Sequence, residues 1–281
     1  MKSFKRGARN ARDGIEPVVD AAEEFSNTKT LDVIARLGYG MTGLLHLLIG
    51  LVALRLAMGG TGEADTSGAI EDIAQRVPGK VAMWVGFISC MGLALWQLSE
   101  ATLRARRRGP RDRAAKTLMS GSLAVAYAVL ALSFANFAIG PGSDSRRGTR
   151  HFSATVLDAP FGVPLLIGVG LVVAVVGGYF VLKGLRRKFR AELHFADSRR
   201  GVVIDAVGVV GHVAKGLALV LVGVLFGVAA VQREGVESTG LDGSLKVLLE
   251  QPLGPYLLGF IGVGFICHGA FGMVRARYGR M

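Results

Sequence analysis

The stretch from Val207 to Val231 constrains the fold of this chain more than any other feature. It runs for 25 residues, and its one fully charged side chain is Lys215. A helix needs roughly 20 apolar residues to cross a hydrocarbon core of about 30 Å. A helix on the surface of a soluble protein has no reason to be apolar on every face over that length. The stretch is therefore predicted to span a membrane.

Five further apolar stretches share this character, and together they predict six spans: 37–58, 81–101, 118–139, 163–182, 207–231 and 255–274. The chain has 51% hydrophobic residues and 40 glycines among 281 residues, and glycine is frequent in membrane helices. Amphipathic segments at 69–77 and 241–251 precede the second and the sixth span. The sequence thus predicts an all-α integral membrane protein with six transmembrane helices and short amphipathic outer segments.

Basic residues are distributed unevenly between the predicted loops. The N-terminal arm, the second and fourth loops and the C-terminal tail hold 24 lysines and arginines, whereas the first, third and fifth loops hold seven. Loops rich in these residues stay in the cytoplasm, so both termini are predicted to be cytoplasmic and the protein to lie in the plasma membrane. Topology thus explains the formal charge of +12 without a nucleic-acid partner, and the basic loops suit anionic lipid head groups.

The N-terminal arm, residues 1–30, permits two interpretations. Residues 1–12 are basic, and Asp13 is suited to cap a short helix that reaches Phe25. Such a helix, placed beside basic residues, would lie on an anionic inner leaflet. The alternative is a solvated arm without regular structure.

A glycine motif recurs in the first and the fifth predicted span, as Gly38-Tyr39-x-x-x-Gly43 and Gly211-His212-x-x-x-Gly216. A proline followed by glycine, directly or one residue later, precedes each even-numbered span. The chain therefore divides into three two-span repeats, 31–108, 109–195 and 196–281, of which the middle copy is the least regular. Because each repeat enters the membrane from the same side, the copies are parallel and are suited to pack around a pseudo-threefold axis.

These motifs resemble those of the bacterial multi-pass membrane family catalogued as domain of unknown function 1206. The family's repeat opens with Leu-Gly-Tyr-x-x-Arg-Gly, and the segments that begin at Leu37 and Val210 are similar to it. Residues 177–189 are similar to the end of the middle repeat. The resemblance implies a six-helix integral membrane protein and no established activity. Thr42 replaces the family's arginine in the first repeat, and Lys215 is the one cation left at this position.

Ionisable side chains inside membrane spans are costly and are therefore candidate functional residues. We expect them to gather in one polar pocket that faces the cytoplasm: His46, Glu100, Asp205, His212, Lys215 and His268. In such a pocket Glu100 or Asp205 would neutralise Lys215, because an unpaired buried charge is strongly unfavourable. The alternative explanation is structural: Lys215 snorkels toward the inner interface, and the histidines form hydrogen bonds across helices. A third is axial ligation of haem or a metal by His46 and His268.

No catalytic or metal-binding motif accompanies these residues. The chain lacks a G-x-S-x-G turn, a Walker motif and paired Cys/His spacing, and its glycine-rich stretches lie inside apolar helices. We therefore expect no catalytic residue, metal or cofactor. The sequence favours a non-enzymatic structural or accessory component of the membrane or of a membrane complex, associated with itself or with another membrane protein. The alternatives are a transporter or channel for a small molecule or ion, and a haem- or metal-binding redox subunit.

Overall fold

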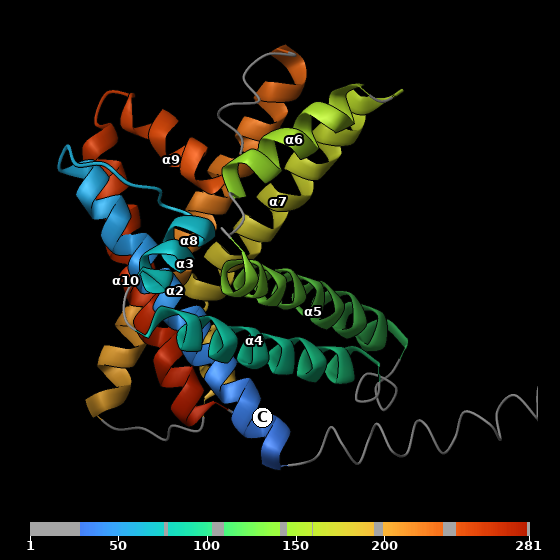
Figure 1. Ribbon diagram of the computed structural model, residues 1–281, viewed down its shortest axis with the longest axis vertical. Coiled ribbons are helices and arrows are strands. Elements are labelled where there is room, and N and C mark those ends of the chain that lie inside the picture. Colours follow the sequence, from blue (N-terminus) through green and yellow to red (C-terminus); the bar gives the residue numbers. More distant parts are fainter. Residues whose placement is uncertain are drawn as a thin grey trace, which may run out of the picture.

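The computed structural model describes residues 29–75, 78–102, 110–140, 145–158, 160–193, 199–232 and 240–279 (Figure 1). Six long α-helices and four shorter helices follow one another in these ranges: α2 (Lys29–Ala57), α3 (Thr66–Ala74), α4 (Gly79–Thr102), α5 (Pro110–Ile139), α6 (Ser145–Asp158), α7 (Gly162–Leu185), the 3₁₀ helix η2 (Lys188–Glu192), α8 (Arg199–Gln232), α9 (Leu241–Leu249) and α10 (Gly254–Tyr278). All six long helices are long and apolar enough to cross a membrane, which confirms the predicted fold class. The predicted arm helix from Asp13 to Phe25 lies outside the described residues.

The helices extend beyond the predicted spans mainly at the ends assigned to the cytoplasm. α2 begins at Lys29 rather than at residue 37, and α8 begins at Arg199 rather than at residue 207. Hydropathy marks only the stretch that must be apolar, whereas backbone hydrogen bonds continue the helix through polar residues beyond it.

A tight turn leads into each of the helices α4, α7 and α10. At the glycine that begins each helix, Gly79, Gly162 and Gly254, a side chain would collide with a backbone carbonyl at the end of the preceding short helix. Phe161 and Leu253, directly before two of these glycines, lie in the left-handed region, at φ 66° and 65°. The proline–glycine signal therefore marks the same turn in all three repeats.

Two seams between helices are closed by opposed glycines. Along α10 and α2, a Cβ added at Gly43 would lie 2.8 Å from the carbonyl oxygen of Gly269, and one at Gly50 would lie 2.6 Å from that of Gly262. Along α7 and α8, Gly177 faces Gly216 and Gly170 faces Gly223 in the same way. Each seam joins the second long helix of one repeat to the first long helix of another. Small residues allow this approach of one backbone to another, which is a main source of helix association in lipid.

The first glycine of the recurring motif makes a different contact. Gly38 allows α2 to pack closely against α4, since a Cβ there would lie 2.5 Å from the carbonyl oxygen of Ser89. Gly211 allows α8 to pack closely against α10, since a Cβ there would lie 2.5 Å from the amide nitrogen of His268. The motif thus gives each helix two contacts, one within its own repeat and one with a neighbouring repeat.

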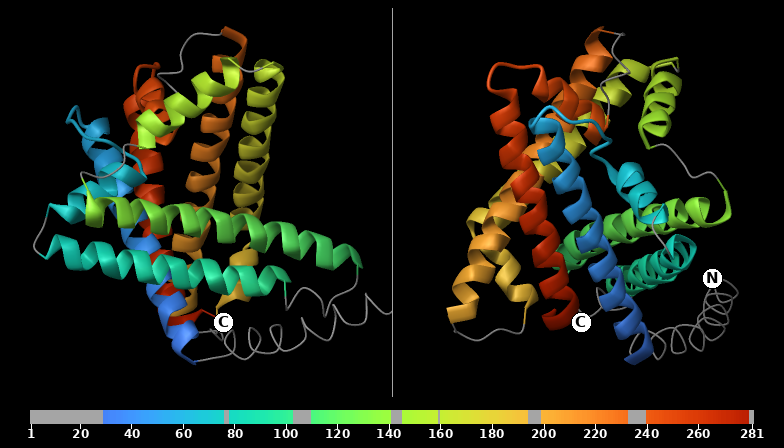
Figure 2. Two further views of the ribbon diagram at one scale, coloured as in Figure 1. Left: turned by 45° about the vertical axis from the view of Figure 1, so that its right-hand side comes forward. Right: turned by 60° about the vertical axis from the view of Figure 1, so that its left-hand side comes forward.

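The remaining seam, between α4 and α5, is built differently. Phe134 of α5 is fully buried, and its ring lies 2.6 Å from where a Cβ would stand on Gly86 of α4. Figure 2 shows that the α4–α5 pair lies across the group formed by α2, α7, α8 and α10. A large side chain seated on a glycine therefore replaces the opposed glycines of the other two seams.

Outside the membrane spans, α9 is tied to the segment before α3. The carboxylate of Asp242 accepts a hydrogen bond from the amide of Ala64 at 2.9 Å and pairs with Lys246 at 2.7 Å. Asp65 caps α3 by accepting a hydrogen bond from the amide of Gly68 at 2.9 Å. Burial, together with the neighbouring charges of Asp242 and Glu63, raises the pKa of Asp65 from 3.8 to about 6. These contacts hold repeats 1 and 3 together on that side.

Candidate functional site

Lys215 lies near the middle of α8, at the centre of a polar cluster shared by three helices. Its Nζ lies 3.1 Å from Nε2 of His46 on α2 and 3.3 Å from Nε2 of His268 on α10. The ring of Phe180 on α7 lies 5.0 Å from the same nitrogen, within the range of a cation–π contact. The lysine predicted to meet a carboxylate is therefore surrounded by two imidazoles and a benzene ring.

Hydrogen bonds to backbone carbonyls fix the tautomers of two histidines. Nδ1 of His46 lies 2.7 Å from the carbonyl oxygen of Thr42, and Nδ1 of His212 lies 2.7 Å from that of Gly208. A carbonyl oxygen only accepts, so each Nδ1 carries the proton and donates it. Nε2 of His46 is then an acceptor when the ring is neutral, and it receives an N–H of Lys215. His268 differs, because its Nδ1 is buried and has no hydrogen-bond partner among the residues that the structure describes.

Aromatic rings enclose the cluster on its inner side. The ring of His212 stacks on Phe189 with 5.0 Å between centroids, and His268 lies edge-on to His212, also at 5.0 Å. His268 is likewise edge-on to His46, at 4.8 Å. Phe189 belongs to η2, the segment that joins the second repeat to the third, and its side chain is fully buried. The three histidines therefore form one contiguous group, and Phe189 stacks on its His212 end.

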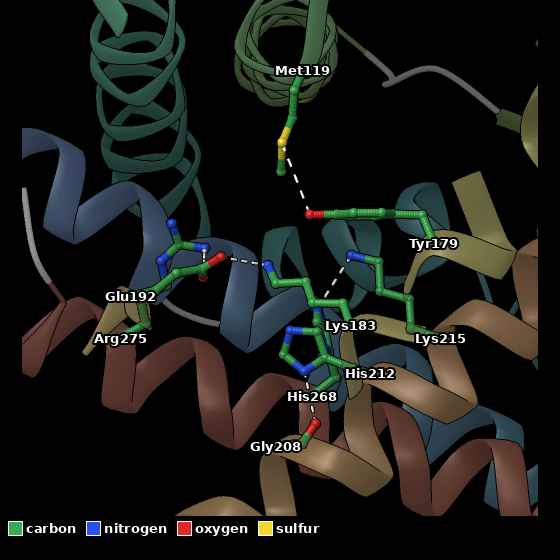
Figure 3. A network of polar contacts seen from close by, with 9 residues as sticks. All are labelled: Met119, Tyr179, Lys183, Glu192, Gly208, His212, Lys215, His268 and Arg275. Atoms are coloured by element: carbon green, nitrogen blue, oxygen red, sulfur yellow. Dashed lines mark hydrogen bonds and ion pairs between the residues drawn. The ribbon is translucent and has the colours of Figure 1, made fainter. Parts of the chain in front are cut away.

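An ion network lies next to this group, toward the end assigned to the cytoplasm (Figure 3). Glu192 of η2 pairs with Lys183 of α7 at 2.5 Å and with Arg275 of α10 at 2.8 Å. The guanidinium of Arg275 lies 4.2 Å from the centre of the Tyr39 ring on α2. Burial alone would raise the pKa of Glu192, but the two cations lower it below its usual value. One carboxylate thus joins α7 and α10 through η2.

One of the predicted pocket residues, Asp205, has a different partner from the one expected. Asp205, expected to neutralise Lys215, instead forms an ion pair with Arg190 of η2, whose Nε donates to Oδ1 at 2.7 Å. Both residues line a cavity of about 310 Å³ together with Arg187, Val202, Ala206, Val209 and Val210. Glu100 is buried near the end of α4. The pairing of Asp205 with Lys215 was therefore wrong, because the path of η2 brings Arg190 to Asp205.

The sequence analysis missed Lys183, Glu192 and Arg275, which it counted only as loop or tail charges. A signal was present: Glu100, Lys183 and Arg275 each lie 21 residues after the glycine that begins their helix. Two of these equivalent positions carry the cations that Glu192 joins, and the third carries an acid. Aligning the charged residues of the three repeats, as the glycines are aligned, therefore indicates these three equivalent positions.

The cluster does not fit a metal or haem held by His46 and His268. Nζ of Lys215 occupies the space between their Nε2 atoms, which are the atoms that would bind iron. Among the residues that the structure describes, no three His, Cys, Asp or Glu side chains are arranged to hold a metal ion. The geometry instead supports hydrogen bonding and proton exchange between nitrogens.

Comparisons with known proteins find the same organisation. The family model described as Domain of Unknown Function (DUF1206) matches three segments, residues 37–104, 120–187 and 210–279. The chain is also similar to the uncharacterized protein YxxB of Bacillus subtilis (strain 168), with 26% identity over 251 residues that cover 88% of this chain and 90% of the relative. No solved structure matches the chain.

Proposed function

This chain belongs to the DUF1206 family of multi-pass membrane proteins, and we propose that it is a non-enzymatic component of the plasma membrane, structural or accessory to a membrane complex. The supporting observation is that charged side chains at one end of the long helices, the end proposed to be cytoplasmic, join helices to one another. Glu192 links α7 to α10, and Asp205 links α8 to η2 through Arg190. Together with the opposed glycines, these contacts make a firmly packed framework.

Two helices leave apolar surface for lipid or for another membrane protein. In the apolar windows of α5 and α7, 17% of the residues are buried, compared with 39% in α2 and 44% in α8. Exposed side chains on α7 include Leu171, Val172 and Val175. A partner helix, from a second copy or from another protein, would cover this surface, and the basic loops would contact anionic head groups.

Purification from gently solubilised native membranes tests the structural proposal. We expect the chain to elute as a homo-oligomer or with a stoichiometric membrane protein. Apolar-to-charged substitutions at exposed positions of α7, such as Val172→Glu, should release the partner, whereas the exposed loop substitution Glu250→Gln should not. Elution of a lone monomer that carries no partner under several mild detergents would contradict the proposal.

Reporter fusions test the proposed orientation. A fusion after residue 195 should report a cytoplasmic position, and a fusion after residue 240 an external one, because the loops rich in lysine and arginine are expected to stay inside. The reverse pattern at either site would overturn the proposed location of both termini.

Transport of a small molecule or ion is the second candidate, and the polar cluster around Lys215 favours it. Ionisable groups in the middle of a membrane are costly, and they occur where ions or protons pass. Here four such groups from three helices are in contact.

A further inference from the structure

We infer that the cavity between α8 and the turn from α7 into η2 is a binding site for one anionic phospholipid. The inference rests on the proposed place of the chain in the membrane, and it assigns a defined lipid site to the basic segment that follows α7. The cavity, of about 310 Å³, is lined on one side by Arg187 and Arg190 of this turn and on the other by residues of α8. The arginines suit a phosphodiester group, and the α8 side suits the first carbons of an acyl chain.

The turn brings the two arginines to the same cavity. The amide of Arg190 donates a hydrogen bond to the carbonyl oxygen of Arg187 at 3.1 Å, and both side chains line the cavity. Arg187 follows the end of α7 in a left-handed conformation, with φ 51°, at a position where glycine is usual. Within the part of the chain that the structure describes, its side chain forms no ion pair or hydrogen bond. Its guanidinium is therefore available to a ligand.

Arg190 is held in place by Asp205 but keeps donors for a ligand. The carboxylate of Asp205 accepts hydrogen bonds from Nε and Nη2 of Arg190. Because a guanidinium carries five N–H groups, those of Nη1 and the second one of Nη2 are left over from this pair. The Arg190 side chain is 54% exposed, whereas that of Asp205 is 11% exposed. Two arginines against one aspartate leave the cavity with one positive charge, which favours an anion.

The opposite wall of the cavity is apolar. Its residues recur at helical spacing and so share one face of α8: Val202, Ala206, Val209 and Val210. The stretch of α8 predicted to enter the membrane begins at residue 207, so this face crosses the level where head groups give way to hydrocarbon. A phosphate at the arginines with acyl carbons on the valines has the order of charge and hydrocarbon found in a membrane lipid. A soluble phosphate would use the arginines and leave the apolar wall uncovered.

Thermal melting with added lipid tests the site. The full chain, purified in detergent, is titrated with phosphatidylglycerol, with phosphatidylcholine and with glycerol 3-phosphate, which has the phosphate but no acyl chain. A ligand that binds only the folded state raises the melting temperature in proportion to its occupancy. We expect a saturable increase with phosphatidylglycerol, a smaller one with phosphatidylcholine, whose choline ammonium is repelled by the basic turn, and none with glycerol 3-phosphate.

Two pairs of variants locate the site. Arg187→Gln should weaken phosphatidylglycerol binding by about 10-fold, the scale of one lost charge-assisted hydrogen bond. Its control, Arg186→Gln, changes the same charge at the neighbouring exposed residue, which does not line the cavity, and should bind as the parent does. Ala206→Phe fills the cavity without changing charge and should abolish the lipid-dependent increase. Val203→Phe, at an exposed position outside the cavity, should retain it.

Three results would overturn the site. Equal increases with phosphatidylglycerol and phosphatidylcholine would mean that the cavity does not select an anionic head group. Equal binding by both members of either variant pair would place the lipid elsewhere on the surface. An equal increase with glycerol 3-phosphate would assign the arginines to a soluble phosphate. Each of these results concerns the lipid titration alone, whereas failure of the proposed assembly or orientation would appear in the co-purification or in the reporter fusions.

Discussion

The first long helices of the three repeats carry the same glycine, yet only two of them use it. Gly38, Gly121 and Gly211 are each the second residue of a segment matched by the family model. Gly38 and Gly211 lie against the backbones of α4 and α10, whereas a Cβ on Gly121 of α5 would meet nothing within 4 Å. Five positions further on, Gly43 and Gly216 close the seams to neighbouring repeats, and Ala126 stands exposed on α5.

This difference teaches that a glycine permits a close contact without producing one. α2 and α8 each lie between two helices, but α5 makes its main contact with α4 alone. That contact uses the buried ring of Phe134 rather than opposed glycines. Repeats 1 and 3 are therefore joined by backbone contact, and repeat 2 divides its helices between two neighbours.

The largest effect should follow from removing the carboxylate that joins the two glycine-closed seams. Glu192→Gln leaves Lys183 and Arg275 facing each other without an acid, and we expect a loss of about 3 kcal/mol in unfolding free energy. The pKa of Glu192 in the folded protein lies below its usual 4.5. The stability difference between the parent and Glu192→Gln should therefore have its full size above pH 4.5 and shrink as the pH falls below 4.5. Thermal melting in detergent across this range measures it.

The matched control is Glu250→Gln, because Glu250 is exposed at the end of α9. It should leave the melting temperature unchanged. Equal melting of Glu192→Gln and the parent at neutral pH would mean that the ion network does not hold α7 and α10 together.

Smaller effects on stability, opposite in sign, are expected at two adjacent glycines of α7. The Cβ of Gly177→Ala would lie 2.6 Å from the carbonyl oxygen of Gly216, so α7 and α8 must separate, at a cost of about 2 kcal/mol. Gly178 has no atom within 4 Å, and Gly178→Ala should stabilise the helix by about 0.5 kcal/mol. Melting temperatures of the two variants therefore bracket the parent's. If glycine did not close the seam between α7 and α8, both variants would shift the melting temperature in the same direction.

The smallest effect concerns the contact between repeats 1 and 3 outside the membrane. Because the folded pKa of Asp65 is raised to about 6, the unfolded chain ionises first, and stability falls as the pH rises from about 4 to 6. Asp65→Asn keeps an oxygen that can cap α3 and removes this loss, so it should be more stable than the parent at pH 7. The two proteins should melt alike near pH 4. A difference that is independent of pH would contradict the burial of the Asp65 carboxyl.

The sequence predicts the helices of this fold better than their partners. Hydropathy identifies all six spans, and the proline–glycine signal places the starts of α4, α7 and α10. The motif glycines indicate close packing, but nothing in their spacing says that Gly43 faces Gly269 on α10. Lys215 and the three histidines, expected to gather in one pocket, do lie together. Asp205 instead pairs with an arginine of η2, a segment whose path no periodicity in the sequence describes. Local pattern determines the elements, and tertiary packing determines which side chains touch.

The difference between the repeats is tested most directly by one alanine at each equivalent glycine. Gly38→Ala and Gly211→Ala should each lower the melting temperature, because their Cβ atoms would lie 2.5 Å from backbone atoms of α4 and α10. Gly121→Ala should raise it slightly, because a helical alanine is favoured over glycine where space is open. If Gly121→Ala lowers the melting temperature as much as the other two do, α5 packs on its own repeat as α2 and α8 do, and the contrast drawn between the repeats is wrong.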